Sequence, residues 1–399
     1  MFLTKDEERI LDGENGHAAQ KSMQILLALG DIFGADKLIP VSSVQIAGVS
    51  YHNLGDAGLK YLSNLAKDGK VCVPTFLNPA GMDLLNWERL GISKEFAEKQ
   101  TLVIDAFAKM EVTTTCTCTP YLIGIVPKLG EHIAWAESSA VTYANSILGA
   151  RTNREGGPSA IASALTGKTP NYGLHLTENR APDVLVKVEP EIKSIADWGA
   201  LGFAIGKRAK NQIPYIIGPK EGSLDCLKSF GASIVTFGSK PMYHLEGLTP
   251  EAKEYLPPKE TLVIGKEELN EAFSHLNDKE KTIDFVSLGC PHASMDELRN
   301  VASLLDGKKI DTGVTMWVSC ARPILNKAKE EGLVDIIEAS GAMVCADTCM
   351  AVAPLKGRFK SIATTSAKGC FYTSGHNNMK THIGSLEECV NAALTGKWN

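Results

Sequence analysis

Three short segments, far apart along the chain, each carry a cysteine. In each segment the residues around the cysteine are typical of a loop and follow an apolar run. The segments are TCTCTP at 115–120, LGCPH at 288–292 and DTCM at 347–350. Loops converging from several strand ends deliver thiolates to iron–sulfur clusters in this way. A cluster with three protein thiolates leaves one iron open for Lewis-acid chemistry. The alternative is that these cysteines are small buried apolar residues. Because no CxxC pair is present, the spacing does not decide between the two.

Spacing also leaves open which cysteine of two neighbouring pairs would bind a metal. Cys116 and Cys118 are two residues apart and point the same way on an extended chain. Cys345 and Cys349 are four apart and would share one face of a helix. The remaining text around Cys72, Cys226 and Cys389 is apolar or helical and favours core packing.

Arginines and glycines coincide with a predicted helix start in the segment GARTNREGGPS at 149–159. Pro158 suits the first turn of a helix predicted over 159–165, with Gly157 at its cap. Backbone N–H groups at this end, flanked by Arg151 and Arg154, would bind a phosphate or a carboxylate. The alternative is a solvated loop whose arginines lie at the surface.

Further polar residues stand in apolar surroundings. Glu137, Ser138 and Ser139 follow the apolar residues 134–136, and Lys368 lies in the run TTSAKG at 364–369. A carboxylate and hydroxyls in a cleft would orient a polyhydroxylated acid, and a lysine would hold an anion or transfer a proton. His292, next to the second cysteine loop, would bond to a cluster or a substrate. Each of these residues has a structural role as its alternative, and for His292 and His376 the alternative is an ordinary surface histidine.

The order of the strands and helices that would position these residues predicts an α/β fold. We expect strands at 37–46, 71–76, 213–218, 233–237, 260–264, 284–288 and 314–318, and helices at 18–33, 222–230, 266–276, 294–305 and 323–331. Strands alternating with helices in the second half predict parallel sheets covered by helices. Such sheets bind ligands in loops at the carboxyl ends of their strands. We place domain boundaries so that an N-terminal α/β domain covers 1–187, a central α/β unit 188–258 and a C-terminal α/β domain 259–399.

Composition limits the function classes. The chain has 399 residues, 44% of them hydrophobic and 22% charged, with a formal net charge of -5. No basic face is evident, which argues against a nucleic-acid partner. The N-terminus is charged and lacks a signal peptide's apolar run, and no stretch approaches the roughly 20 apolar residues of a membrane span. We therefore expect a cytoplasmic protein, in which ten reduced cysteines point to metal binding or catalysis rather than disulfides.

Taken together, these segments resemble the aconitase X family, specifically the large subunit of its heterodimeric type. The matching text runs through nearly the whole chain. It includes GDIFGA at 30–35, AGVSY at 47–51, LNPAGM at 77–82, TCTPY at 117–121, AESSA at 136–140, GARTNREGG at 149–157, GCPH at 289–292 and DTC at 347–349.

The resemblance implies an aconitase-like α/β fold, with several three-layer α/β/α domains and mostly parallel sheets around a central iron–sulfur cleft. It implies an iron–sulfur hydro-lyase. In the archaeal branch of the family the reaction dehydrates (R)-5-phosphomevalonate to trans-anhydromevalonate 5-phosphate, a step of a modified mevalonate pathway to isoprenoids. Fused relatives dehydrate cis-3-hydroxy-L-proline instead, so the resemblance leaves the choice of substrate open.

Carried over residue by residue, the resemblance implies particular site residues. The cluster ligands would be Cys118, Cys290 and Cys349, holding a [4Fe-4S] cluster with one open iron, although the absence of a CxxC pair leaves the nuclearity open. Substrate contacts would come from Gly48, Val49, Ser50, Asn78, Pro79, Glu137, Ser138 and Lys368. The catalytic base is expected on a swivelling domain that this family type carries as a separate small subunit. The chain is therefore expected to supply half of an active site in a heterodimer.

Two other classes compete with the hydro-lyase. An electron-transfer or redox-sensing iron–sulfur protein would use four thiolates, and the spare cysteines permit it. A non-catalytic scaffold for a small subunit would have no use for Arg151, Arg154, Glu137 and Lys368 beside the cysteine loops.

Overall fold

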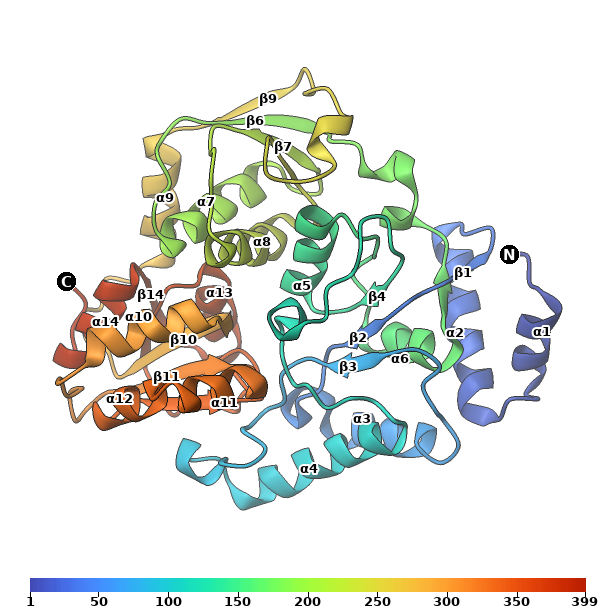
Figure 1. The fold of residues 1–399 in the computed structure, drawn as a ribbon, viewed down its shortest axis with the longest axis horizontal. Helices are drawn as coiled ribbons and strands as arrows, with labels where there is room; N and C mark the ends of the chain where they lie inside the picture. Colours follow the sequence, from blue (N-terminus) through green and yellow to red (C-terminus); the bar gives the residue numbers. More distant parts are fainter.

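The computed structural model describes all 399 residues and has four sheets surrounded by helices (Figure 1). The chain forms three units, which lie around a common centre in Figure 1 and contribute in turn the blue-to-green, green-to-yellow and orange-to-red parts of the ribbon. All strand pairs are parallel except in one two-stranded sheet. The predicted α/β fold with mostly parallel sheets is therefore confirmed.

The N-terminal unit holds a small parallel sheet in the order β3-β2-β4 and an antiparallel pair, β1-β5. Its strands are β1 (Leu38–Pro40), β2 (Val44–Ile46), β3 (Thr75–Leu77), β4 (Ala134–Trp135) and β5 (Lys168–Pro170). Its helices are α1 (Lys5–Asp12), α2 (His17–Phe33), α3 (Tyr51–Leu65), α4 (Lys94–Lys109), α5 (Ser138–Tyr143) and α6 (Gly157–Thr166). The strands predicted at 37–46 and 71–76 are shorter than expected. Prolines and the turn between β1 and β2 interrupt these extended segments.

The middle unit is a four-stranded parallel sheet in the order β8-β7-β6-β9 with helices packed on it. The strands are β6 (Val184–Val188), β7 (Pro214–Ile217), β8 (His244–Leu245) and β9 (Thr261–Ile264). The helices are α7 (Ile195–Arg208), α8 (Leu224–Gly238) and α9 (Lys266–Leu276).

The predicted strand at 233–237 is wrong, because α8 continues through this segment to Gly238. Its β-branched residues are buried against α7, where packing overrides intrinsic propensity. Ser233 Oγ donates to the carbonyl oxygen of Gly199, 2.6 Å away. A Cβ on Gly202 would lie only 2.7 Å from Cβ of Ser233. Glycines on α7 thus allow a close approach of two helices that a sequence pattern does not reveal.

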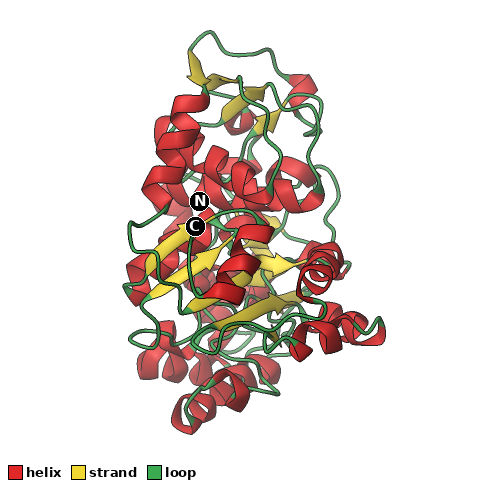
Figure 2. Ribbon diagram, turned by 90° about the vertical axis from the view of Figure 1, so that its left-hand side faces the viewer, coloured by secondary structure: helices red, strands yellow, loops and turns green.

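The C-terminal unit is a five-stranded parallel sheet in the order β12-β11-β10-β13-β14. Figure 2 faces the side of the molecule that holds this unit and shows its strands as broad yellow arrows among red helices. The strands are β10 (Phe285–Ala293), β11 (Thr315–Cys320), β12 (Met343–Ala346), β13 (Ser361–Thr364) and β14 (Lys380–Ile383). The helices are α10 (Met295–Leu305), α11 (Arg322–Glu330), α12 (Leu333–Ala339), α13 (Ala367–Asn377) and α14 (Leu386–Thr395). One face of the sheet packs on α10, α11, α12 and α14, and the other meets residues of the N-terminal unit.

The pairing of the strands indicates where one unit ends and the next begins. β9 pairs with β6, so residues 261–264 belong to the middle sheet, and α9 packs against α7. We propose a boundary between Leu276 and Phe285 in place of the one predicted at 258. The boundary at 187 falls inside β6, and we propose that it lies a few residues earlier.

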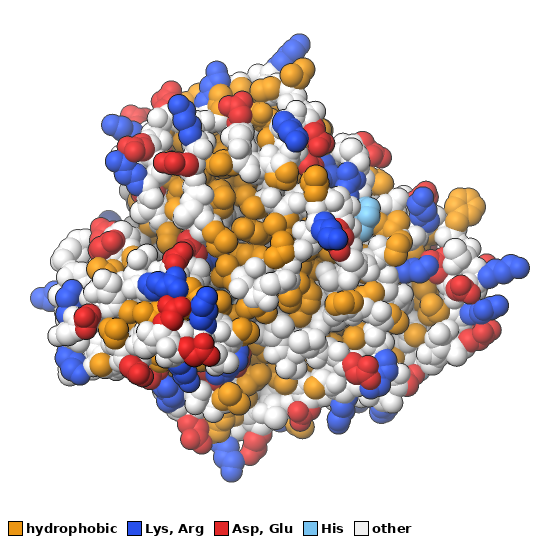
Figure 3. Space-filling view, in the orientation of Figure 1, with side chains coloured by type: hydrophobic (Ala, Val, Ile, Leu, Met, Phe, Trp, Pro, Cys, Tyr) orange, Lys and Arg blue, Asp and Glu red, His pale blue; other side chains and the backbone are white.

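Buried ion pairs join the C-terminal unit to the other two. Lys228 of α8 pairs with Glu297 of α10, and Arg322 of α11 pairs with Asp83, which follows β3. On the face shown in Figure 3, acidic and basic side chains are mixed around the periphery while apolar atoms gather near the centre. No helix combines the length and apolar character that crossing a bilayer requires.

Candidate active site

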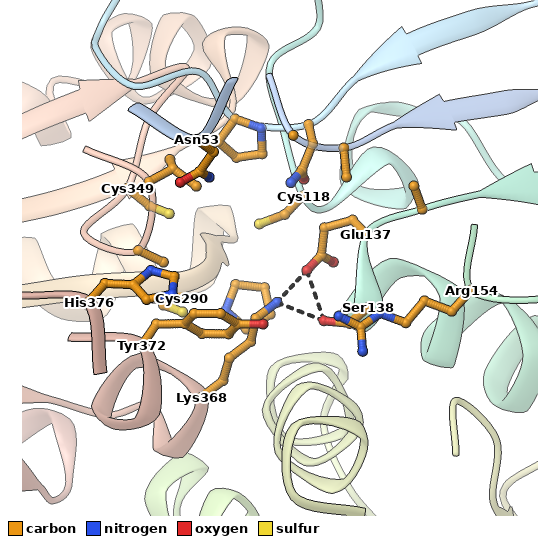
Figure 4. A pocket seen from close by; sticks show the side chains of 18 residues that line it. Asn53, Cys118, Glu137, Ser138, Arg154, Cys290, Cys349, Lys368, Tyr372 and His376 are labelled. Atoms are coloured by element: carbon orange, nitrogen blue, oxygen red, sulfur yellow. Dashed lines mark hydrogen bonds and ion pairs between the residues drawn. The ribbon is translucent and has the colours of Figure 1, made fainter. Parts of the chain in front are cut away.

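A cavity of about 290 Å³ lies between the N-terminal and C-terminal units, where the ends of their parallel strands face each other (Figure 4). Its walls come from the loops after β2, β3, β4 and β12, from the loop before Pro120, from β10 and from α13. The lining residues are Ala47, Gly48, Asn53, Asn78, Pro79, Cys118, Ala136, Glu137, Ser138, Arg154, Cys290, Pro291, Cys349, Ala351, Val352, Lys368, Tyr372 and His376. This placement follows the rule that open parallel sheets present ligand sites at the carboxyl ends of their strands.

The three predicted thiols all reach this cavity. Cys118 and Cys349 point into it from loops, and Cys290 points into it from the irregular end of β10 (Figure 4). Of the two pairs that spacing left open, Cys116 is fully buried away from the cavity, and Cys345 lies in β12 with its Sγ 3.3 Å from Ser319 Oγ. That Cys118, Cys290 and Cys349 bind a cluster stays a prediction.

Local backbone conformation explains how two of these loops turn. Gly289 adopts a φ of 84°, and a Cβ there would lie 2.0 Å from the carbonyl oxygen of Ser319, so only glycine fits before Cys290. Asp347 also has a positive φ, of 66°. Its carbonyl oxygen accepts a bond from the N–H of Ala80, and its carboxylate pairs with Arg322, which fixes the turn into Cys349.

Burial raises the pKa of all three thiols, and that of Cys349 reaches about 12. A neutral thiol is therefore favoured until a metal displaces its proton. No three His, Cys, Asp or Glu side chains are close enough together to hold a single metal ion. One ion gathers its thiolates about 2.3 Å from its centre, whereas in a cluster each thiolate binds a different iron. The three thiols therefore do not form a site for one ion, and a cluster does not require them to.

Opposite the thiols, Glu137 and Lys368 form a buried ion pair (Figure 4). Glu137 caps α5, where its Oε2 accepts from the N–H of Ala140 at 2.8 Å and from Ser139 Oγ. Its Oε1 accepts from Lys368 Nζ and from Ser138 Oγ, the latter at 3.3 Å. Burial by itself would raise the pKa of Glu137, but the Lys368 ammonium outweighs it and the pKa is lowered. The Glu137 carboxylate in turn raises the pKa of Lys368 against the effect of burial. Both groups are charged at neutral pH.

The two arginines of the predicted anion loop have different environments. Arg154 lines the cavity and takes part in none of the hydrogen bonds or ion pairs within the chain. Arg151 instead donates through Nη1 to the carbonyl oxygen of His175 and to Thr177 Oγ1, both at 2.9 Å. Arg154 also borders a second cavity of about 360 Å³, which reaches to Gly157 and Pro158 at the start of α6. Only Arg154 is therefore placed to meet an anion in the cavity.

Two predicted contact residues do not line the cavity. Val49 is buried, and its carbonyl oxygen accepts from Gln100 Nε2 at 3.0 Å. Ser50 caps α3 and its Oγ donates to the carbonyl oxygen of Val352 at 2.9 Å, which ties the loop after β2 to the C-terminal unit. Gly48, Asn78, Pro79, Glu137, Ser138 and Lys368 do line it, and their contact with substrate stays a prediction.

Sequence reasoning missed two lining residues with polar side chains, Tyr372 and Asn53, and it named His376 without placing it beside Lys368. Tyr372 and His376 lie four and eight residues after Lys368 on α13, so one face of this helix presents all three to the cavity. That spacing is a signal that the sequence contained. Asn53, near the start of α3 where Gly55 interrupts the helical backbone, carried no such signal.

Comparison with known proteins agrees with this geometry. Family models described as the aconitase X first, second and third domains match residues 1–178, 182–274 and 283–395. The phosphomevalonate dehydratase large subunit of Methanosarcina mazei is 46% identical over 100% of this chain and 98% of its own length. This chain belongs to the aconitase X family. The resemblance stated from sequence is therefore confirmed.

Two further similar proteins are a dehydratase of another substrate and a protein of known structure. The cis-3-hydroxy-L-proline dehydratase of Hypocrea jecorina is 37% identical over 99% of this chain, which covers 69% of that protein. The crystal structure of Thermococcus kodakaraensis aconitase X in its holo-form superposes with a TM-score of 0.92 at 44% identity, covering 98% of this chain and 100% of that one. An aconitase-like fold for the whole chain is thus confirmed.

Proposed function

We propose that this chain is the large subunit of an iron–sulfur hydro-lyase that dehydrates (R)-5-phosphomevalonate to trans-anhydromevalonate 5-phosphate. The observation that carries the proposal is a single cavity that holds three convergent thiols on one wall and a buried lysine–glutamate pair on another. Relatives from several archaea that match at 46–47% identity have the name phosphomevalonate dehydratase large subunit, which supports this substrate.

The donor set fits an iron–sulfur cluster held by three residues. Cys118, Cys290 and Cys349 would be its ligands, and we propose the [4Fe-4S] form with one iron free of protein thiolate. When bound, such a cluster supplies Lewis-acid polarisation of the leaving hydroxyl. No fourth cysteine lines the cavity, which speaks against a purely electron-transferring centre with four thiolates.

Lys368 is suited to hold the carboxylate of the substrate. An ammonium group has three N–H donors. Two of them face Glu137 Oε1 and Ser138 Oγ, the latter 3.2 Å away, which leaves one donor for a ligand. Binding the carboxylate there would orient the neighbouring carbon, from which the proton departs.

Glu137 holds the lysine in place and is poorly suited to be the base. A carboxylate has about four acceptor positions. Lys368, Ser138, Ser139 and the N–H of Ala140 already occupy four. Its lowered pKa also makes it a weak proton acceptor. The group that removes the proton is then expected from outside this chain.

We propose that this base comes from a small subunit that carries the swivelling domain and closes over the cavity. Support comes from four relatives that are named large subunits, of whose length this chain covers 94–99%. Arg154, at the edge of the cavity, would hold the phosphate end of the substrate and so supply binding energy for positioning. We propose a cytoplasmic location for the complex.

The test is an anaerobic assay of the reconstituted chain, with and without the small subunit, against (R)-5-phosphomevalonate and cis-3-hydroxy-L-proline. We expect dehydration of the first substrate only, and only with both subunits present. Turnover of hydroxyproline would favour the activity of the relatives at 35–37% identity instead. Full activity of this chain alone would contradict the role proposed for the partner.

A further inference from the structure

His292 lies behind the cavity rather than in it, and its bonds reach all three cysteine loops. The residue is fully buried. Its Nδ1 lies 3.0 Å from Thr117 Oγ1, next to Cys118. Its Nε2 lies 3.0 Å from the carbonyl oxygen of Thr348, next to Cys349. Its own backbone N–H donates to Cys118 Sγ at 3.2 Å, two residues after Cys290. Neither alternative considered from sequence, a cluster or substrate contact or a surface histidine, describes this position.

The partners determine which ring nitrogen carries the proton. The carbonyl oxygen of Thr348 can only accept, so Nε2 must donate to it. In the neutral ring Nδ1 then accepts the hydroxyl proton of Thr117. Thr117 Oγ1 in turn accepts from the N–H of Thr119 at 3.2 Å. Every polar atom of the imidazole is therefore used to join loops that are 175 and 56 residues away along the chain.

The backbone of His292 is itself anchored from the middle unit. Lys228 Nζ donates to the carbonyl oxygen of His292 at 3.0 Å and is balanced by Asp225, 2.9 Å away, and by Glu297. Lys228 is 2% exposed, so these bonds are shielded from water. All three units of the fold therefore meet at this one residue.

We propose that His292 is a positioning residue that fixes the three cysteine loops relative to one another, so that their thiols are presented as one ligand set. As far as it concerns a cluster, the inference rests on the proposed function. The geometric part does not, because it concerns loop order in the metal-free chain.

The first measurement is hydrogen–deuterium exchange of the metal-free full-length chain, followed in peptides covering 115–120, 289–293 and 346–350. We expect His292→Phe, which fills the space without hydrogen bonds, to speed exchange in all three segments by about 10- to 100-fold. This corresponds to about 1.4–2.8 kcal/mol at 1.4 kcal/mol per factor of ten. His292→Gln, whose amide can both donate and accept, should stay within about threefold of the unmodified chain.

His382 offers a matched control on β14. It is also fully buried, but neither of its ring nitrogens has a hydrogen-bond partner. His382→Phe should leave exchange in the three cysteine segments unchanged. If His292→Phe behaves like His382→Phe, or speeds exchange in its own segment only, the proposal is wrong.

Two further measurements keep the test decisive. Should His292→Phe fail to fold, Thr117→Val removes only the hydroxyl bonded to Nδ1, and it should speed exchange both at 115–120 and at 289–293. An effect confined to 115–120 would overturn the proposal. In the iron-reconstituted protein, a chelator should remove iron about 10- to 100-fold faster from His292→Phe than from His382→Phe. Faster exchange in a chain that takes up no iron would uphold the positioning role and contradict the proposed cofactor.

Discussion

Replacing Arg154 by alanine tests whether the phosphate end of the substrate meets the cavity edge. The guanidinium lines the cavity and has no partner within the chain, so its loss breaks no internal bond. The fold and the thiol wall should be unaffected, because Arg154 is exposed and the three cysteines lie on other loops. The expected effect is therefore on substrate binding alone.

The magnitude follows from the bond that would be lost. A hydrogen bond between a guanidinium and a phosphate is charge-assisted and contributes about 1.5–3 kcal/mol. At about 1.4 kcal/mol per factor of ten, this is roughly a 10- to 150-fold loss of affinity. We expect KM for phosphomevalonate to rise by this factor in the assembled enzyme, with bound iron unchanged. Steady-state kinetics with both subunits present, together with an iron assay, measures the two quantities.

Arg151→Ala is the matched control, three residues away in the same loop. Arg151 is tied to His175 and Thr177, so its removal should lower the midpoint of thermal unfolding but change KM by less than about threefold. An unchanged KM in Arg154→Ala would refute the assignment and place the phosphate elsewhere. A larger rise of KM in Arg151→Ala than in Arg154→Ala would show that the loop acts as a whole.

Two other predictions concern the opposite walls of the cavity. Lys368→Met leaves the buried Glu137 carboxylate without its cation, which should cost about 3–5 kcal/mol of unfolding free energy and abolish turnover. Because Lys368 holds the pKa of Glu137 below its ordinary value of 4.5, Glu137 stabilises the native fold above that pH and ceases to do so as the pH falls through the lowered value. In Lys368→Met burial raises this pKa instead, so urea unfolding should show a larger loss at pH 8 than at pH 5, and equal losses would contradict the reasoning. Cys349→Ser should reduce bound iron and visible absorbance to background. Cys389→Ser is the control, because Cys389 is buried in α14 away from the cavity, and it should retain both. Full iron content in Cys349→Ser would show that Cys349 is not a cluster ligand.

Much of the fold followed from local patterns in the sequence. The helix predicted at 266–276 has those bounds, and its first turn is stabilised by Glu268, whose carboxylate accepts from the N–H of Gly265. Such features depend on residues that are near one another along the chain, so the sequence carries them directly. The strand predicted at 233–237 was wrong, because its apolar residues belong to α8 and are buried against α7. Local propensity does not contain this tertiary packing.

The site residues whose type is unusual for their segment could be predicted from the sequence. The contacts that form only when distant segments pack together could not. Residue type was enough to predict the cysteines beside glycine or proline at strand ends. It was also enough to predict a lysine and a glutamate within apolar segments. The pairing of Glu137 with Lys368 joins residues 231 apart and could not be inferred from either segment. The fully buried place of His292 behind the cavity was equally hidden, since a histidine after a cysteine loop gives no sign of which side it faces.

The long separation between the cysteine loops has a consequence for how the protein is made. Cys118 and His292 lie 174 residues apart. A ribosome adds about 5–20 residues per second, so the first thiol emerges roughly 10–35 s before its partner loop exists. Throughout that interval Cys118 lacks the other two proposed ligands, and its thiol is open to oxidation or to binding of another metal. Under the proposed function, iron loading would follow translation of nearly the whole chain, and the nascent polypeptide would need a reducing environment to keep its first thiol intact until then.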